Sequence, residues 1–186
     1  YPSAIYPEVN INYINEISSS SLNLTKCSNE ECGLVQLANK YNLDTVFKHY
    51  PFLSGETATM KNILSDVVSN MDDLFSFNKE DVILDIGGND GTMLKMVPSK
   101  VKAKINIDAA QNINQVLDTK NYYYVNEKYS AKAYLKLGIP LPRMIFSIAM
   151  FYHLDDPFSF CNEVKKIMTD ETIWCIQMTY LGSMIE

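Results

Sequence analysis

The sequence lacks the features that mark several large classes of protein. Its 186 residues contain a single arginine, Arg143, and the formal net charge is −6. Nucleic-acid-binding proteins usually carry a basic, arginine-rich face, so this charge balance argues against a nucleic-acid partner. No run approaches about 20 consecutive apolar residues, the length that crosses a bilayer, so we expect no membrane span.

Cysteine is scarce, and nothing at the start of the sequence has the pattern of a leader. The 4 cysteines are too few for a disulfide scaffold in a chain of 186 residues, so we expect a reducing compartment, the cytoplasm. The first residue is Tyr1, and no charged and then apolar segment follows it. Apolar residues make up 47% and charged residues 20%, which is typical of a soluble globular protein with a core.

Two parts of the chain differ in pattern. Residues 1–45 are rich in Asn and Ser and show no long periodic segment, so they predict a small irregular appendage with one short strand at 34–37. Residues 46–186 are expected to form the main domain. Apolar residues over 57–75 recur at helical spacing, which predicts an amphipathic helix.

Short apolar runs and helical segments alternate after that helix. We expect strands at 81–86, 103–108, 122–125, 144–149 and 172–179, and helices at 92–97, 112–117, 130–137 and 157–168. This alternation predicts an α/β fold with a doubly wound, mainly parallel sheet. Ligands of such sheets bind at the carboxyl ends of the strands.

A glycine-rich loop follows the strand at 81–86. Its candidate cofactor-binding residues are Asp85, Gly87, Gly88, Asn89, Asp90 and Gly91. Glycine permits a tight turn and close approach of the backbone to a ligand. The loop matches neither the G-x-G-x-x-G pattern of dinucleotide sites nor the G-K-[ST] ending of phosphate loops, and its two acids would repel a pyrophosphate. It therefore favours a cationic ligand.

A third acid, Asp108, ends the next strand about 20 residues further on, where a carboxylate often accepts hydrogen bonds from ribose hydroxyls. A nucleoside that carries positive charge and no phosphate describes S-adenosylmethionine. The alternative is structural, because a glycine turn and an acid at a strand end also occur without a ligand.

Four stretches carry a family resemblance. Residues 81–94 (DVILDIGGNDGTML) resemble the first motif of class I S-adenosylmethionine-dependent methyltransferases. Together with 24–37, 50–64 and 148–157, they resemble the sugar-nucleotide C-methyltransferases that carry an N-terminal zinc-binding module. The resemblance implies a Rossmann-like fold, S-adenosylmethionine as cofactor and a nucleotide-linked 4-keto sugar as the small-molecule substrate.

The resemblance also assigns roles to residues. His153 follows the fourth strand and is the candidate base that removes a proton beside the ketone; the alternative is a helix cap near Asp155 and Asp156. Tyr50 would lie over the junction of cofactor and substrate, with an aromatic anchor for the next helix as the alternative. The other candidates are Ser54, Ala109, Ala149 and Met150 for the cofactor, and Gln177 and Tyr180 for the sugar.

The chain also departs from the family pattern. In the family, the zinc module has four cysteines in two close pairs. In this chain, Cys27 and Cys32 form one pair spaced C-x4-C, so we expect them to bind zinc only in a longer protein. The chain ends before the family's later catalytic segment and last strands. We therefore expect either that the uncovered apolar last strand pairs with another chain, as in a homo-oligomer, or that the chain is a fragment, incomplete at the C-terminus. Two alternative functions stay open: O-methylation of a sugar or other small metabolite, and cofactor binding without turnover.

Overall fold

The computed structural model describes residues 23–39, 50–113, 121–180 and 182. The chain divides into two compact units, Tyr1–Pro51 and Phe52–Glu186. The domain boundary predicted between residues 45 and 46 lies outside the described residues, as does most of the helix expected at 112–117.

The first unit contains an antiparallel hairpin. Strand β1 (Leu24–Lys26) pairs with β2 (Val35–Leu37), and both are exposed. The turn between them is held by backbone bonds in which the N–H of Cys27 donates to the carbonyl of Leu34 (2.8 Å) and the N–H of Cys32 donates to that of Asn29 (3.0 Å). Strand β2 was predicted, whereas β1 was not.

The second unit is built on a five-stranded parallel sheet with the strand order β5-β4-β3-β6-β7. The strands are β3 (Val82–Ile86), β4 (Ala103–Ile107), β5 (Tyr122–Val125), β6 (Met144–Ile148) and β7 (Ile173–Gln177). The helices are α3 (Ala58–Phe75), α4 (Thr92–Met96), α5 (Ala131–Leu135), the 3-10 helix η1 (Phe151–His153) and α6 (Pro157–Lys165). The predicted doubly wound parallel α/β sheet is confirmed.

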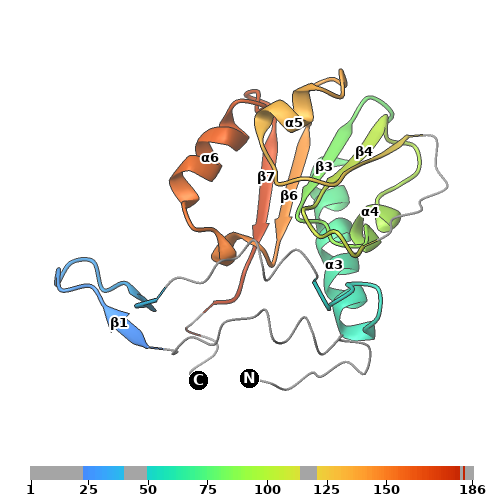
Figure 1. Cartoon of the computed structure of the whole chain (residues 1–186). Coiled ribbons are helices and arrows are strands. Elements are labelled where there is room, and N and C mark those ends of the chain that lie inside the picture. Colours follow the sequence, from blue (N-terminus) through green and yellow to red (C-terminus); the bar gives the residue numbers. More distant parts are fainter. Residues whose placement is uncertain (1–22, 40–49, 114–120, 181, 183–186) are drawn as a thin grey trace. The chain divides into compact units, whose positions relative to one another are not determined.

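Helices cover both faces of this sheet (Figure 1). Ile83 and the alternate positions of the inner strands pack against α3 and α4 on one face. Leu84 and the remaining positions of these strands pack against α5 and α6 on the other face. Every residue of β3, β4 and β6 is buried, which explains why β3 and β6 appear in the sequence as mostly apolar runs.

Helix α3 begins and ends with side-chain and backbone caps. The Thr57 hydroxyl accepts a hydrogen bond from the N–H of Met60 (3.2 Å), and Ser76, in the left-handed conformation, donates its N–H to the carbonyl of Asp72. Leu64 and Val68 are its buried residues. Both belong to the apolar stripe that predicted this helix.

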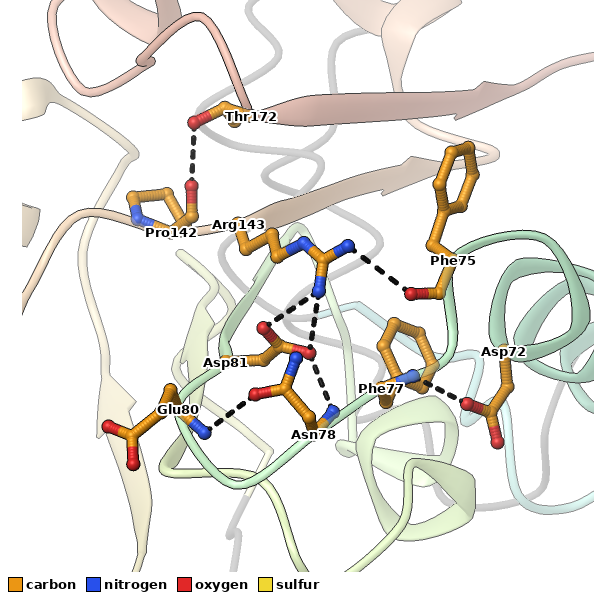
Figure 2. A network of polar contacts seen from close by, with 9 residues as sticks. All are labelled: Asp72, Phe75, Phe77, Asn78, Glu80, Asp81, Pro142, Arg143 and Thr172. Carbon is orange, nitrogen blue, oxygen red and sulfur yellow. Dashed lines mark hydrogen bonds and ion pairs between the residues drawn. The ribbon is translucent and has the colours of Figure 1, made fainter.

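The only arginine ties elements together at the amino edge of the sheet (Figure 2). One guanidinium nitrogen of Arg143 donates to both carboxylate oxygens of Asp81 (3.2 and 3.4 Å), and the other donates to the carbonyl of Phe75 at the end of α3 (3.2 Å). Asp81 is buried and also accepts the N–H of Asn78 (2.7 Å). The carboxyl edge, where ligands of such sheets bind, lies at the opposite ends of the strands.

Strand β7 is the edge strand on one side of the sheet as far as the chain is described. The expectation that nothing covers it is wrong for its faces, because Trp174 packs against the α5–α6 cluster while Ile173 and Cys175 pack against the α3–α4 cluster. Only Ile176 is exposed within the strand. Among the described residues, no helix is long and apolar enough to cross a membrane.

Candidate functional site

The glycine loop, residues 85–91, turns sharply between β3 and α4. Gly87 and Gly91 have φ values of +73° and +72°, and Asn89 also lies in the left-handed region at +52°. Gly88 is required for a different reason. A Cβ atom there would lie 2.5 Å from Oδ2 of Asp85 and 2.6 Å from Oδ1 of Asn106. The loop therefore needs glycine for conformation at two positions and for space at a third.

Asp85 lies beneath this loop at the end of β3. Its side chain is almost fully buried, and burial, followed by the nearby charge of Asp108, raises its pKa well above the usual value. A cation that approaches such a buried carboxyl group would stabilise its ionised form and lower its pKa.

Asp108, at the end of β4, fastens the loop from the side. Its Oδ2 accepts the N–H of Asn89 (2.8 Å) and its Oδ1 accepts the N–H of Ala110 (2.8 Å). Each carboxylate oxygen accepts up to two hydrogen bonds, so this half-buried group retains acceptor capacity on both oxygens. The structural alternative and the ligand-binding prediction are thus compatible.

The side chains of Asn89 and Asp90 contact the segment that precedes α3. Asn89 accepts the N–H of Ser54 at Oδ1 (3.0 Å) and donates from Nδ2 to the carbonyl of Phe52 (2.9 Å). Asp90 accepts the N–H of Gly55 at Oδ2 (2.9 Å) and that of Thr92 at Oδ1 (3.0 Å). We call the contacts of Asn89 and Asp90 with residues 52–55 the 52–55 clamp.

A cavity of about 20 Å³ lies next to Ser54 of the clamped segment and is large enough for about one water molecule. Its polar lining comes from buried Ser54, from Asp85 and from the backbone of the glycine loop, and Met60, Leu64, Met93 and Ile148 complete it. Ser54 and Asp85 therefore line the same cavity.

His153 ends the 3-10 helix η1 after β6. Burial lowers the pKa of its imidazole below the ordinary 6.5, which favours the neutral, proton-accepting form at neutral pH. The cap of α6 is Asp156, which accepts the N–H of Ser159 (3.0 Å), so His153 is not needed for that function. An aromatic cluster anchors η1, since the ring of Phe151 lies 6.0 Å from that of Trp174.

Residues at the ends of β6 and β7 lie at the carboxyl edge of the sheet, as the glycine loop does. Ala149 has a φ of +54° and donates its N–H to the carbonyl of Gln177 (2.9 Å). Met150 lies next to Gly87, because a Cβ atom added to Gly87 would be 3.3 Å from the side chain of Met150. Non-glycine residues at positive φ cluster at functional sites.

The remaining candidate residues have fewer described contacts with the glycine loop. Ala109 is half-buried beside Asp108, whereas Tyr180 is 75% exposed. Tyr50, Cys27 and Cys32 belong to the first unit, and both of these cysteines are exposed. Among the described residues, no three His, Cys, Asp or Glu side chains gather as a metal site would require.

Sequence reasoning missed two polar residues that support the site from within the core. Asn106 donates from Nδ2 to the carbonyl of Asn89 (3.1 Å), and Lys104 donates from Nζ to the carbonyls of Leu94 (2.9 Å) and Val97. Burial lowers the pKa of Lys104. The available signal was their alternation within an otherwise apolar strand, on the face toward α4.

Comparisons with known proteins identify the fold. No family model matches the chain. The C-methyltransferase NovU of Streptomyces niveus is 17% identical over 157 residues, which cover 83% of this chain and 37% of that protein. The chain thus spans little more than a third of the length of this relative.

Among solved structures, precorrin 8w decarboxylase of Methanobacterium thermoautotrophicum is 16% identical, with a TM-score of 0.49 over 75% of this chain and 73% of that one. The plantazolicin methyltransferase BpumL, solved with a triazolic desmethylPZN analog and SAH, is 18% identical, with a TM-score of 0.50 over 65% of this chain and 47% of that one. The chain has a Rossmann-like methyltransferase fold. In this methyltransferase fold, the glycine loop and Asp108 follow the two adjacent strands β3 and β4.

Proposed function

We propose that this chain is the cofactor-binding part of an S-adenosylmethionine-dependent methyltransferase that C-methylates a nucleotide-linked keto sugar. The observation that carries the proposal is the position of two acids, Asp85 and Asp108, around a glycine loop at the carboxyl ends of β3 and β4. The methyltransferase fold and the similarity to a C-methyltransferase support it.

The acids and the loop fit S-adenosylmethionine by charge and by hydrogen-bonding capacity. Asp108 has acceptor capacity for ribose hydroxyls, and the carboxyl group of Asp85 favours a cationic ligand over a phosphate, because an approaching cation stabilises its ionised form. When bound, the cofactor supplies an electrophilic methyl group. Gly87, Gly88 and Gly91 keep the backbone close to it, with Ser54, Ala109, Ala149 and Met150 as further contacts.

His153 is the proposed base. Its neutral imidazole accepts the proton from the carbon beside the substrate ketone, and the resulting enolate is the nucleophile. The anchored η1 helix limits the movement of the ring, which is a positioning contribution. Gln177 and Tyr180 are proposed for the sugar pocket, and Tyr50 for the junction of cofactor and substrate.

Three further proposals concern the longer protein. Cys27 and Cys32 would provide two of the four ligands of a structural zinc ion, with the other two cysteines supplied by the rest of a longer protein. The outer edge of β7 would pair with another copy of the chain, since an edge strand offers unpaired backbone groups. The third proposal is that the protein resides in the cytoplasm, the reducing compartment expected from its low cysteine content.

Calorimetric titration with S-adenosylhomocysteine tests the cofactor site. We expect saturable binding, weakened about tenfold or more by Asp108→Asn, the loss expected for a charge-assisted hydrogen bond. Asp170→Asn, which removes an exposed acid, is the control and should bind like the parent chain. No binding by the parent chain would refute the proposal.

Transfer of label from S-adenosylmethionine to a panel of nucleotide-linked 4-keto sugars tests the reaction. His153→Asn should retain affinity for S-adenosylhomocysteine and lose about a hundredfold or more in methyl transfer, the usual contribution of a general base. Methyl transfer at the parental rate by this variant would refute the role of His153.

A further inference from the structure

The 52–55 clamp connects two parts of the molecule that are far apart in the sequence. Asn89 and Asp90 together bind three backbone groups of the segment, the N–H of Ser54, the N–H of Gly55 and the carbonyl of Phe52. Backbone groups are the only partners in these three bonds, so the contact holds the path of the segment whatever its side chains are.

The clamp is itself fixed from below. The N–H of Asn89 donates to Asp108 and its carbonyl accepts from Asn106, so the backbone of Asn89 is held on both sides. Its left-handed conformation turns the amide side chain toward residues 52–54. Asn is among the few residues that adopt this conformation readily and also offers both a donor and an acceptor.

The clamped segment forms a wall between two spaces. On its inner side is the small cavity lined by Ser54, Asp85 and Gly88. On its outer side is an open depression of about 520 Å³ lined by Gly55, Glu56, Lys61, Asp90, Thr92, Lys95 and Met96. Loss of the clamp would free Ser54 to move away from the cavity that it lines together with Asp85.

Close packing at Gly55 strengthens this wall. A Cβ atom at Gly55 would lie 2.7 Å from Oγ1 of Thr92 and 2.8 Å from Oδ2 of Asp90. The segment therefore lies directly on the start of α4, at a distance that only glycine allows.

We infer that Asn89 and Asp90 are positioning residues, which act on the cofactor through the segment 52–55 by holding Ser54 as the wall of the cavity above Asp85. This inference rests on the proposed function. It revises the prediction from sequence, in which Asn89 and Asp90 themselves contact the cofactor.

Asn89→Gly separates the side chain from the backbone conformation. Glycine adopts positive φ freely, so the loop keeps its path while both side-chain bonds to the segment disappear. Asn162→Gly, at an exposed position of α6, is the matched control, since it makes the same substitution away from the site, at a cost of about 0.3–0.5 kcal/mol in helix propensity.

Hydrogen exchange and calorimetry read the two steps separately. In the parent chain without ligand, the Ser54 and Gly55 amides should exchange slowly, and Asn89→Gly should speed exchange at Ser54 at least tenfold. Its affinity for S-adenosylhomocysteine should fall at least tenfold, while Asn162→Gly leaves both quantities unchanged. Asn89→Asp keeps an acceptor for Ser54 and should restore protection of that amide, which a general loss of stability would not produce.

Each possible failure has its own signature. Fast exchange of both amides in the parent chain would overturn the clamp itself. Parental affinity for S-adenosylhomocysteine in Asn89→Gly would overturn its link to the cofactor while the cofactor site stands. No binding by the parent chain, with both amides protected, would overturn the proposed function and the positioning role that depends on it.

Discussion

Replacing Gly88 with alanine tests the central loop most directly. The new Cβ would lie 2.5 Å from Oδ2 of Asp85 and 2.6 Å from Oδ1 of Asn106, both closer than real Cβ contacts. Asp85 is 2% exposed and Asn106 is 0% exposed, so neither side chain can turn out into solvent to relieve the clash. Because Gly88 is not among the residues at positive φ, the clash alone opposes the substitution.

The expected cost follows from this crowding. Overpacking a buried site typically costs about 1–3 kcal/mol, and a clash with two buried polar groups belongs in the upper part, at about 2–3 kcal/mol. For a chain of this length each kcal/mol lowers the melting temperature by about 2–4 °C, so we expect a fall of about 4–12 °C. Movement of the loop should also weaken S-adenosylhomocysteine binding at least tenfold.

Gly138→Ala provides the matched control. Gly138 has a φ of +64°, and no described atom lies within 4 Å of an added Cβ, so the cost is conformational, about 1–2 kcal/mol. Thermal unfolding followed by circular dichroism should show a loss of stability in both variants, and calorimetry should show weaker binding in Gly88→Ala alone. A Gly88→Ala melting temperature within about 1 °C of the parent chain would refute the steric argument.

Three further predictions follow from the charges. Methyl transfer should fall on acidification with an apparent pKa below the usual 6.5 of histidine, because protonated His153 cannot accept a proton; a pH–rate profile with no such limb would contradict this. Burial and the charge of Asp108 raise the pKa of Asp85, so its contribution to stability is fully present below about pH 3.9 and is lost as the pH rises through the native pKa. Urea midpoints should therefore decline more across this range in the parent chain than in Asp85→Asn, and parallel curves would disprove the assignment. Arg143→Met should cost about 2–3 kcal/mol by stripping a buried carboxylate of its partner, whereas Lys102→Met, which removes an exposed ion pair, should cost less than about 1 kcal/mol in the same urea titration.

Most of the sheet was predictable because burial on both faces leaves a direct trace in composition. The runs at 82–86 and 144–148 are apolar because each strand has a neighbour on either side and helices above and below. The predicted strand ends differ from the observed ones by only one or two residues. Thr57 and Ser130, the caps of α3 and α5, were likewise at or next to the predicted starts.

The site was predictable only in part. Glycine spacing located the loop, because special backbone conformations restrict residue type. The clamp was not predictable, because Asn89 and Asp90 bind backbone groups 35 positions away. Every residue type has these backbone groups, so such a bond does not restrict the amino acid at the partner position. Lys104 was missed for a related reason, since its partners are the carbonyls that end α4.

The strand order has a consequence for how the chain acquires its structure. β3 is the first strand of the sheet in the sequence but lies at its centre, between β4 and β6. During synthesis β3, β4 and β5 leave the ribosome first, and one side of β3 stays unsatisfied until β6 emerges. Such long-range parallel pairing is intrinsically slow and leaves intermediates prone to aggregation. We therefore expect the yield of native protein to depend on the docking of β6, and to improve at temperatures that slow synthesis and aggregation.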